Sequence, residues 1–410
     1  MTRDSERPND GVSRRKFILT SGAVGVAGLA GCSGGGDGGD TTQAPDPDTG
    51  GDGGDGGSDS TDTPTEEPPE TTEQAGGDGG DGGSSMLSAE GSSTVYPISN
   101  KGSSYWNSNA PVSDGEYWGS TSESTVPGWD EIQTDKNLAD YFASLYGFET
   151  TGKQTKPPFP TTVGLSHSGT GCKSVRDGLV DIGNSSGPIT AELGISEEQR
   201  DANYVDHVVG RDGQPVVVSK DVWDAGVQQL TGQQIKDIYQ GRITNWSEVG
   251  GPDREIYVVG RAQGSGTDTA FRLNMLGDAK AEMDVDTRKG QNQQVKTVVQ
   301  QNEGTIAYMA LAFTGPQVKP IAIEFDGTVY KPDKDAAHTI FDSDYPLNRD
   351  LHMYTTKTEE YPNGTDMREA AFIYMFTTTF GQETFVEANN YIPLPTKDIE
   401  KERGKLPDQV

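Results

Sequence analysis

From residue 86 onward, short apolar runs alternate with stretches whose apolar residues recur at helical spacing. Four apolar runs predict buried strands, at 216–218, 256–259, 306–309 and 321–323. The helical pattern covers 233–240, 268–276 and 292–301, and later 366–376 and 382–388. Strands that alternate with helices in this way predict an α/β fold.

Residues 101–160 break this alternation. They are rich in Gly, Ser and Trp, show weak periodicity, and end in Pro157-Pro158-Phe159-Pro160. We therefore expect a largely irregular insertion at 101–160.

The N-terminal residues 1–32 have the pattern of an export signal. The pair Arg14-Arg15 precedes an apolar run at 17–30, which is too short to be a permanent membrane-spanning helix. Paired arginines before such a run resemble a twin-arginine signal, and the ending Leu29-Ala30-Gly31-Cys32 is similar to a lipobox. We expect Cys32 to carry a lipid that anchors the exported protein to the outer face of the cytoplasmic membrane. The alternative is a cleaved signal with a chance cysteine.

The next segment, residues 33–85, predicts a disordered acidic tether. It holds 14 acidic residues, 17 glycines and no Lys or Arg. With almost no apolar content, it cannot bury enough surface to offset the entropy lost on ordering.

The overall charge narrows the classes of function. The formal net charge is −30, and residues 86–410 alone hold 46 acidic and 28 basic side chains. Nucleic acid is excluded as a partner because such a surface repels phosphates. Only Cys32 and Cys172 are present, which excludes a disulfide scaffold. The dispersed acidity favours a protein of a halophilic archaeon; the alternative is an ordinary well-hydrated surface.

Three segments rich in Gly, Ser and Thr carry the candidate chemistry. They lie at 91–94, 167–171 and 260–267, and the last two each follow an apolar run and open a helical stretch. Small residues let backbone N–H groups approach an anion, hydroxyls add donors, and a helix N-terminus adds its dipole. With Arg261 beside the third segment, the sequence predicts an oxyanion site.

The sequence contains few of the short motifs that mark known enzymes and metal sites. The sequence has no P-loop, no His-Glu-x-x-His and no Cys-x-x-Cys, and its four histidines are scattered, so we expect no metal and no cofactor. Residues 183–187 match a nucleophile elbow around Ser185. Pro188 delays the helix that an elbow requires, so a hydrolase stays a lesser alternative.

An ordered set of motifs resembles the phosphate-binding proteins of phosphate ABC transporters. It begins with Glu90-Gly91-Ser92-Ser93-Thr94-Val95-Tyr96-Pro97 and continues at 168–171, 180–186, 230–246, 259–267, 345–347 and 391–395. The resemblance covers nearly all of 86–398 except the insertion. It implies a two-lobed type II periplasmic-binding-protein fold with a ligand cleft between the lobes. By position, lobe one is 86–212 plus 340–398 and lobe two is 213–339, with chain crossings near 206–216 and 345–354.

The same resemblance implies the ligand set and no catalytic residue. The phosphate ligands carried over are Thr94, Val95 (through its backbone N–H), Ser168 and Ser186 from lobe one, and Arg261, Ser265, Gly266 and Thr267 from lobe two. Two positions depart from well-known members, because Ser186 and Gln263 each stand where an Asp is found. Selection of phosphate over sulfate is therefore left open.

We thus expect a lipid-anchored solute-binding protein that is not an enzyme and that delivers inorganic phosphate to a membrane permease. A surface phosphate sensor, a phosphohydrolase using Ser185 and a binder of another tetrahedral oxyanion such as sulfate remain alternatives. His167 is expected at a solvent-facing or backbone-bonded position rather than beside the anion. Cys172 is expected as a small buried residue rather than a reactive thiol.

Overall fold

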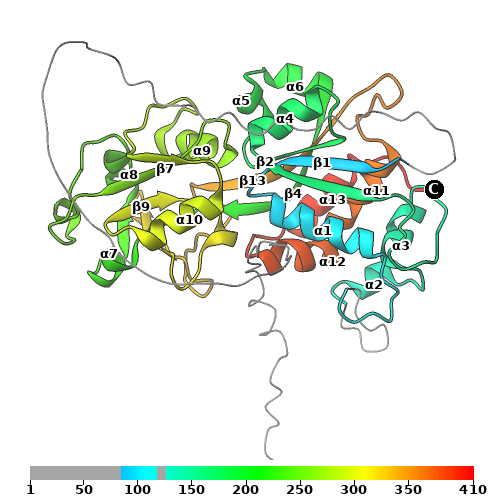
Figure 1. Ribbon diagram of the computed structural model, residues 1–410, viewed down its shortest axis with the longest axis horizontal. Coiled ribbons are helices and arrows are strands. Elements are labelled where there is room, and N and C mark those ends of the chain that lie inside the picture. Colours follow the sequence, from blue (N-terminus) through cyan, green and yellow to red (C-terminus); the bar gives the residue numbers. More distant parts are fainter. Residues whose placement is uncertain (1–84, 118–125) are drawn as a thin grey trace, which may run out of the picture. The chain divides into compact units, whose positions relative to one another are not determined.

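The computed structural model describes residues 85–117 and 126–410 (Figure 1). The expected export signal with Cys32 and all but the last residue of the expected tether lie outside the described residues. Within the described ranges, no helix combines the length and the apolar character that crossing a membrane requires.

The first sheet has five strands in the order β2-β1-β3-β13-β4. Their bounds are β1 Leu87–Ser92, β2 Thr161–Ser166, β3 Ile182–Ser185, β4 Tyr204–Gly213 and β13 Asn348–Thr356. Strand β1 pairs in parallel with β2 and β3, while β13 runs antiparallel to β3 and β4. Because carboxyl ends of parallel strands share one edge, the turns after β1, β2 and β3 meet there.

A second and a third sheet come from the middle of the chain. The second has the order β10-β5-β9-β7-β8 and the third the order β12-β11-β6. Their bounds are β5 Val216–Val218, β6 Gln229–Thr231, β7 Tyr257–Arg261, β8 Thr287–Lys289, β9 Thr305–Tyr308, β10 Lys319–Pro320, β11 Ala322–Phe325 and β12 Thr328–Tyr330. The four strands predicted from apolar runs are confirmed as β5, β7, β9 and β11, within two residues at each end.

Helices cover these sheets, and in Figure 1 α4 and α1 lie on opposite sides of the first sheet. The longer helices are α1 Tyr96–Ser108, α4 Ser168–Arg176, α8 Gly232–Tyr239, α10 Asn292–Gln301, α11 Met367–Phe376 and α13 Thr396–Arg403. The shorter ones are α2 Trp129–Ile132, α3 Leu138–Ser144, α5 Ile189–Leu193, α6 Glu197–Asn203, α7 Lys220–Asp224, α9 Gly266–Phe271 and α12 Thr379–Gly381. Residues Arg272–Leu276 and Gln382–Val386 form π-helical turns, and Trp246–Val249, Leu311–Phe313 and Glu387–Asn389 form 3-10 turns. The helices predicted at 233–240, 268–276, 292–301 and 366–376 are confirmed, and 382–388 folds as the π and 3-10 turns that follow α12.

The described residues of 101–160 are mostly irregular, as expected, but they also hold the end of α1, α2 and α3. Trp106, Phe142 and Phe159 are fully buried, so parts of this segment pack into the core. The apolar pattern of the sequence did not predict this part of α1, because the buried face of the helix carries the small residues Ser99, Gly102 and Ser103. A Cβ atom on Gly102 would lie 2.3 Å from the Phe376 ring, so close packing replaces a large apolar side chain there.

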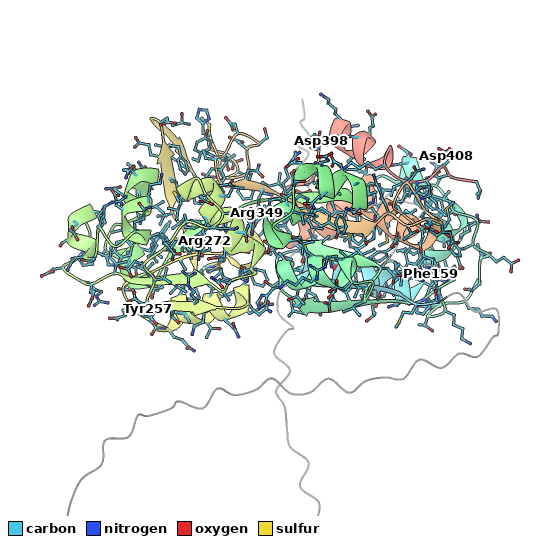
Figure 2. The ribbon with its side chains drawn as sticks, turned by 90° about the horizontal axis from the view of Figure 1, so that it is seen from above. Phe159, Tyr257, Arg272, Arg349, Asp398 and Asp408 are labelled. Carbon is cyan, nitrogen blue, oxygen red and sulfur yellow. The ribbon has the colours of Figure 1, made fainter. Side chains whose placement is uncertain are left out.

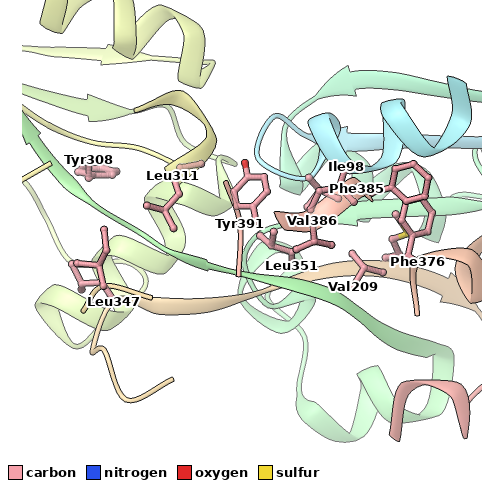
Figure 3. Packing of buried hydrophobic residues seen from close by; sticks show 14 of the residues in the cluster. Ile98, Val209, Tyr308, Leu311, Leu347, Leu351, Phe376, Phe385, Val386 and Tyr391 are labelled. Carbon is pink, nitrogen blue, oxygen red and sulfur yellow. The ribbon is translucent and has the colours of Figure 1, made fainter. Parts of the chain in front are cut away.

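The chain passes from the first sheet to the second between β4 and β5, and returns between β12 and β13. These passages overlap the crossings expected near 206–216 and 345–354. Apolar residues pack along the route: Figure 3 shows Val209, Leu351 and Val386 at one side and Leu347 and Tyr308 at the other. Tyr391 lies between the two groups.

Candidate functional site

The turns after β1, β2 and β3 bring the predicted serines of the first sheet together. Ser92 Oγ donates a hydrogen bond to Ser186 Oγ at 2.9 Å. The Ser186 backbone N–H donates to Ser168 Oγ at 3.1 Å, and the two hydroxyls are 3.5 Å apart. All three side chains are buried. Three turns that are distant in sequence therefore form one cluster of hydroxyl groups.

Glycines make this close approach possible. Gly91 has φ of +137°, and a Cβ atom there would lie 2.1 Å from the Asn184 carbonyl oxygen. A Cβ atom on Gly171, in the first turn of α4, would lie 2.6 Å from the Glu90 carbonyl oxygen. A side chain at Gly91 would clash with β3, and one at Gly171 would push α4 away from the strand ends.

The turn after β7 meets this cluster from the second sheet. Gly266 lies so close that a Cβ atom on it would be 2.3 Å from Ser168 Oγ and 2.8 Å from Ser186 Oγ. Thr267 Oγ1 and Thr94 Oγ1 are 3.0 Å apart. Ser265 is buried at the residue before α9, and Val95 is fully buried at the residue before α1.

Arg261 lies at the end of β7 and is almost fully buried. Its Nη1 donates to Asn292 Oδ1 at 2.7 Å, and its Nη2 donates to the Gly290 carbonyl and, at 3.3 Å, to Ser93 Oγ. Burial lowers the pKa of the Arg261 guanidinium to about 10, so it stays protonated at neutral pH. This buried cation therefore reaches the hydroxyl cluster.

Asn292 was predicted only as the start of a helix. Its Nδ2 donates to Ser93 Oγ at 3.1 Å and to Thr94 Oγ1 at 3.2 Å. Helix α10 thus ties Arg261 to the turn after β1. The available signal in the sequence was a polar amide at the first position of the helix, on the same face as Val295 and Val299.

A second arginine also reaches the cluster and was missed in the sequence. Arg349 lies near the start of β13, and its Nη1 donates to the Ser186 carbonyl at 3.2 Å, while Nη2 approaches Thr94 Oγ1 at 3.4 Å. Its Nε and Nη2 both donate to Asp212 Oδ2, at 3.0 and 2.6 Å. Figure 2 shows Arg349 between the part of the chain with Tyr257 and Arg272 and the part with Phe159.

Asp212 is fully buried beneath this arginine. Its Oδ1 accepts a hydrogen bond from the Leu311 N–H at 2.9 Å. Burial raises the pKa of the Asp212 carboxyl, and the charge of Arg349 works in the opposite direction. Nearby, Gln214 Nε2 donates to the Thr267 carbonyl at 2.8 Å. Asp212 at the end of β4 and Gln214 just after it thus contact the segments that follow β9 and β7 of the second sheet.

The structure also locates His167, Cys172 and Ser185, which were singled out in the sequence. His167 lies beside Gly290, and burial together with the charge of Arg261 lowers its pKa. Cys172 is fully buried and burial raises the pKa of its thiol, which fits the small buried residue and disfavours the reactive thiol. Ser185 Oγ donates to the Gly187 carbonyl at 2.6 Å, in a turn that Pro188 separates from α5.

Comparison with known proteins places this arrangement in a class. Residues 131–379, more than half of the chain, match the model of the PBP superfamily domain, and the chain belongs to that superfamily. Its curated relatives include the phosphate-binding protein PstS of Bacillus subtilis, 29% identical over 249 residues that cover 61% of this chain and 76% of the relative. PstS of Staphylococcus haemolyticus is 30% identical over 251 residues, covering 59% and 75% of the two chains. The resemblance found in the sequence is thereby confirmed.

The fold is shared with a solved structure. A crystal structure described as a phosphate ABC transporter substrate-binding protein with bound phosphate, from Clostridium perfringens, superposes with a TM-score of 0.53. The two sequences are 22% identical, and the match covers 76% of this chain and all of that one. The expected two-lobed type II α/β fold is confirmed.

Proposed function

We propose that this chain is a solute-binding protein that captures inorganic phosphate outside the cytoplasm and delivers it to the permease of an ABC transporter. One observation carries the proposal. Hydroxyls from Thr94, Ser168 and Ser186 meet Gly266 and Thr267, with the guanidinium of Arg261 beside them. A buried set of hydroxyls, backbone amides and a fixed cation is the chemistry that a tetrahedral oxyanion requires.

The proposed ligand set joins the two lobes expected from the sequence. Thr94, Val95, Ser168 and Ser186 belong to 86–212, whereas Arg261, Ser265, Gly266 and Thr267 belong to 213–339. An anion that bonds to both sets favours the closed arrangement of the lobes over an open one. A permease could then distinguish loaded from empty protein by its shape.

Isothermal titration of the mature protein with phosphate, arsenate, sulfate and molybdate tests the ligand class. We expect saturable one-to-one binding of phosphate, which persists in molar salt because the site is buried. Absence of binding for every tetrahedral oxyanion would refute the proposal. Binding of molybdate alone would place the site with a different solute.

We also propose that Cys32 carries a lipid anchor and that Arg14-Arg15 directs export of the folded protein. A Cys32→Ser variant should leave the membrane fraction, and Arg14→Lys with Arg15→Lys should keep the protein in the cytoplasm. Cys172→Ser is the matched control, because that thiol is buried in the fold. Unchanged membrane fractionation of the Cys32 variant would remove the anchor from the proposal.

The acidic surface is proposed to be an adaptation to high salt. Mutual repulsion of the acidic side chains weakens the folded state, and salt screens it. Thermal unfolding should therefore occur at markedly higher temperature in molar KCl than at low ionic strength. A midpoint that does not move with KCl would contradict this.

A further inference from the structure

Arg349 has donors that its structural partner does not use. A guanidinium carries five N–H groups, and Asp212 Oδ2 takes one from Nε and one from Nη2. The remaining three face Thr94 and Ser186, where the contacts are 3.2 to 3.4 Å, at the long end for a charge-assisted hydrogen bond. The side chain is 4% exposed, so these donors serve the buried site and not solvent.

The side-chain oxygens of Asp212 and Asn292, which lie against the two arginines, already accept hydrogen bonds. Asp212 Oδ1 accepts from the Leu311 N–H, and its Oδ2 accepts twice from Arg349. Asn292 Oδ1 accepts from Arg261 and from the Ala310 N–H. The two arginines and Asn292 Nδ2 therefore present hydrogen-bond donors to an anion, and Glu192 Oε1 is a buried oxygen nearby without a hydrogen-bond partner among the described residues.

We infer that Arg349, oriented by Asp212, is a second cationic ligand of the anion and that the site selects dianionic tetrahedral oxyanions. The inference rests on the proposed function and concerns the same site. Arg261 and Arg349 bring two positive charges to the hydroxyl cluster, so an anion of charge −2 gains more than one of charge −1. The site favours hydrogenphosphate over dihydrogenphosphate.

Sulfate should then compete with phosphate. A site built to hydrogen-bond a particular proton rejects an analogue without it by about 10⁴–10⁵-fold, because a buried polar group is left unpaired. Here Ser186 presents a hydroxyl, which can either donate or accept a hydrogen bond. Sulfate, which has no proton to donate, can therefore accept from Ser186. We expect it to bind within about 100-fold of phosphate, far less discrimination than an obligatory acceptor gives.

The first experiment uses the unmodified protein. Phosphate affinity, measured by isothermal titration, should fall as the pH drops below the second ionisation of phosphate, while sulfate affinity changes less. The ratio of the two affinities cancels titration of the groups around Arg349, which are Asp212, Arg261, Glu192 and the hydroxyl of Tyr391. A ratio that stays constant across this pH range would overturn the preference for the dianion.

Variants then test the arginine itself. Arg349→Gln alone leaves Asp212 buried without its cation, so Arg349→Gln combined with Asp212→Asn keeps the pair neutral and isolates the loss of the guanidinium. We expect the double variant to bind phosphate about 10- to 100-fold more weakly. Arg211→Gln is the matched control, because Arg211 on β4 pairs with Asp350 on β13 and with Asp398 on α13, away from the hydroxyl cluster.

The outcomes separate the two proposals. A wild-type protein that binds no oxyanion refutes the proposed function. A wild-type protein that binds phosphate, with a folded double variant that binds it as tightly, refutes only the role of Arg349. If Glu192→Gln abolishes a strong preference for phosphate over sulfate, the proton acceptor is Glu192 and the inferred ligand class is wrong. If the double variant does not fold, the pH dependence and the sulfate affinity of the wild type still decide the ligand class.

Discussion

The two sides of the site are built on different principles. The hydroxyl wall consists of Ser92, Ser93, Thr94, Ser168 and Ser186, all from turns of the first sheet and all without formal charge. The arginine wall consists of Arg261 and the turn that ends at Thr267, beside β7 of the second sheet. The hydroxyl wall supplies shape and neutral donors and the arginine wall supplies charge, while Arg349 on β13 brings a second guanidinium beside the hydroxyl wall.

The residues that pack behind the two walls also differ. Behind the hydroxyl wall, Gly91 and Gly171 let backbones approach each other closely. Behind the arginine wall lies a buried ion network, in which Asp268 accepts from Arg272 at 2.7 Å and from the Tyr308 hydroxyl. Tyr308 in turn accepts from the Arg261 backbone N–H at 3.0 Å. Changes behind the arginine wall should therefore act through electrostatics, and changes in the hydroxyl wall through fit.

The largest expected effect is on stability. Asp268→Ala leaves the buried guanidinium of Arg272 without its carboxylate, and breaking a buried pair in this way costs about 3–5 kcal/mol. Chemical denaturation should show that loss in the free energy of unfolding. The control is Asp237→Ala, whose partner Arg242 is about half exposed and whose loss should cost at most about 1 kcal/mol. Equal losses in both variants would contradict the contrast between the walls.

The next effect is on binding. Arg261→Ala removes the cation of the arginine wall, and hydrogen bonds to charged groups contribute about 1.5–3 kcal/mol each, or one to two decades in affinity. Titration with phosphate in molar salt measures this, because a screened surface cation would contribute little there. Arg176→Ala, at an exposed ion pair, should bind like the wild type. An Arg261 variant that binds phosphate normally in high salt would place the anion elsewhere.

A single methyl group added at Gly266 should disturb the packing between the two walls. Gly266→Ala places a methyl group 2.3 Å from Ser168 Oγ, so the walls must separate. Overpacking of this kind costs about 1–3 kcal/mol, and we expect phosphate binding at least tenfold weaker with little change in unfolding of the ligand-free protein. Gly315→Ala, which meets nothing within 4 Å, is the control. Normal binding by the Gly266 variant would show that the walls do not need to meet.

A carboxylate at the boundary of the walls should make their contact depend on pH. Glu192 lies against Gly169 and Gly187, which follow Ser168 and Ser186 of the hydroxyl wall, and its carboxyl is hydrogen-bonded to Thr269 of α9 beside the arginine wall. Burial raises its pKa to about 7, with the charge of Asp268 adding to the effect. A raised pKa in the folded state means that the stability is present while Glu192 is protonated and is lost as the pH rises through about 7.

Glu192→Gln should remove this dependence. Its thermal midpoint should match the wild type near pH 4 and exceed it above pH 7 by several degrees, for a change of about 3 kcal/mol. Comparing the two proteins at each pH cancels other groups, such as the pair of His352 with Asp206. A wild-type advantage at high pH would reverse the sign and refute the argument.

Local patterns predicted the glycine-serine turns, four strands of the second and third sheets and the helices at 233–240, 268–276, 292–301 and 366–376, because such patterns are visible in a few consecutive residues. Strand 216–218 and helix 292–301 have the bounds that the pattern gave. Arg349 and Asp212 were missed because their meaning lies in the pairing of β13 with β4, where they stand opposite each other across 137 residues of chain. Only the register of two distant strands makes them a pair.

The smallest effect should come from the hydroxyl wall. Ser168→Ala deletes the oxygen that accepts from the Ser186 N–H, while the backbone of α4 stays in place. A neutral hydrogen bond contributes about 0.5–1.5 kcal/mol, so phosphate affinity should fall by less than about tenfold. Thr267→Ala, which removes the hydroxyl facing Thr94, should behave similarly. Several neutral donors bond to the anion, so each contributes less to the phosphate affinity than a buried cation does. A Ser168 variant as weak as Arg261→Ala would mean that the hydroxyl wall, and not the arginine wall, holds the anion.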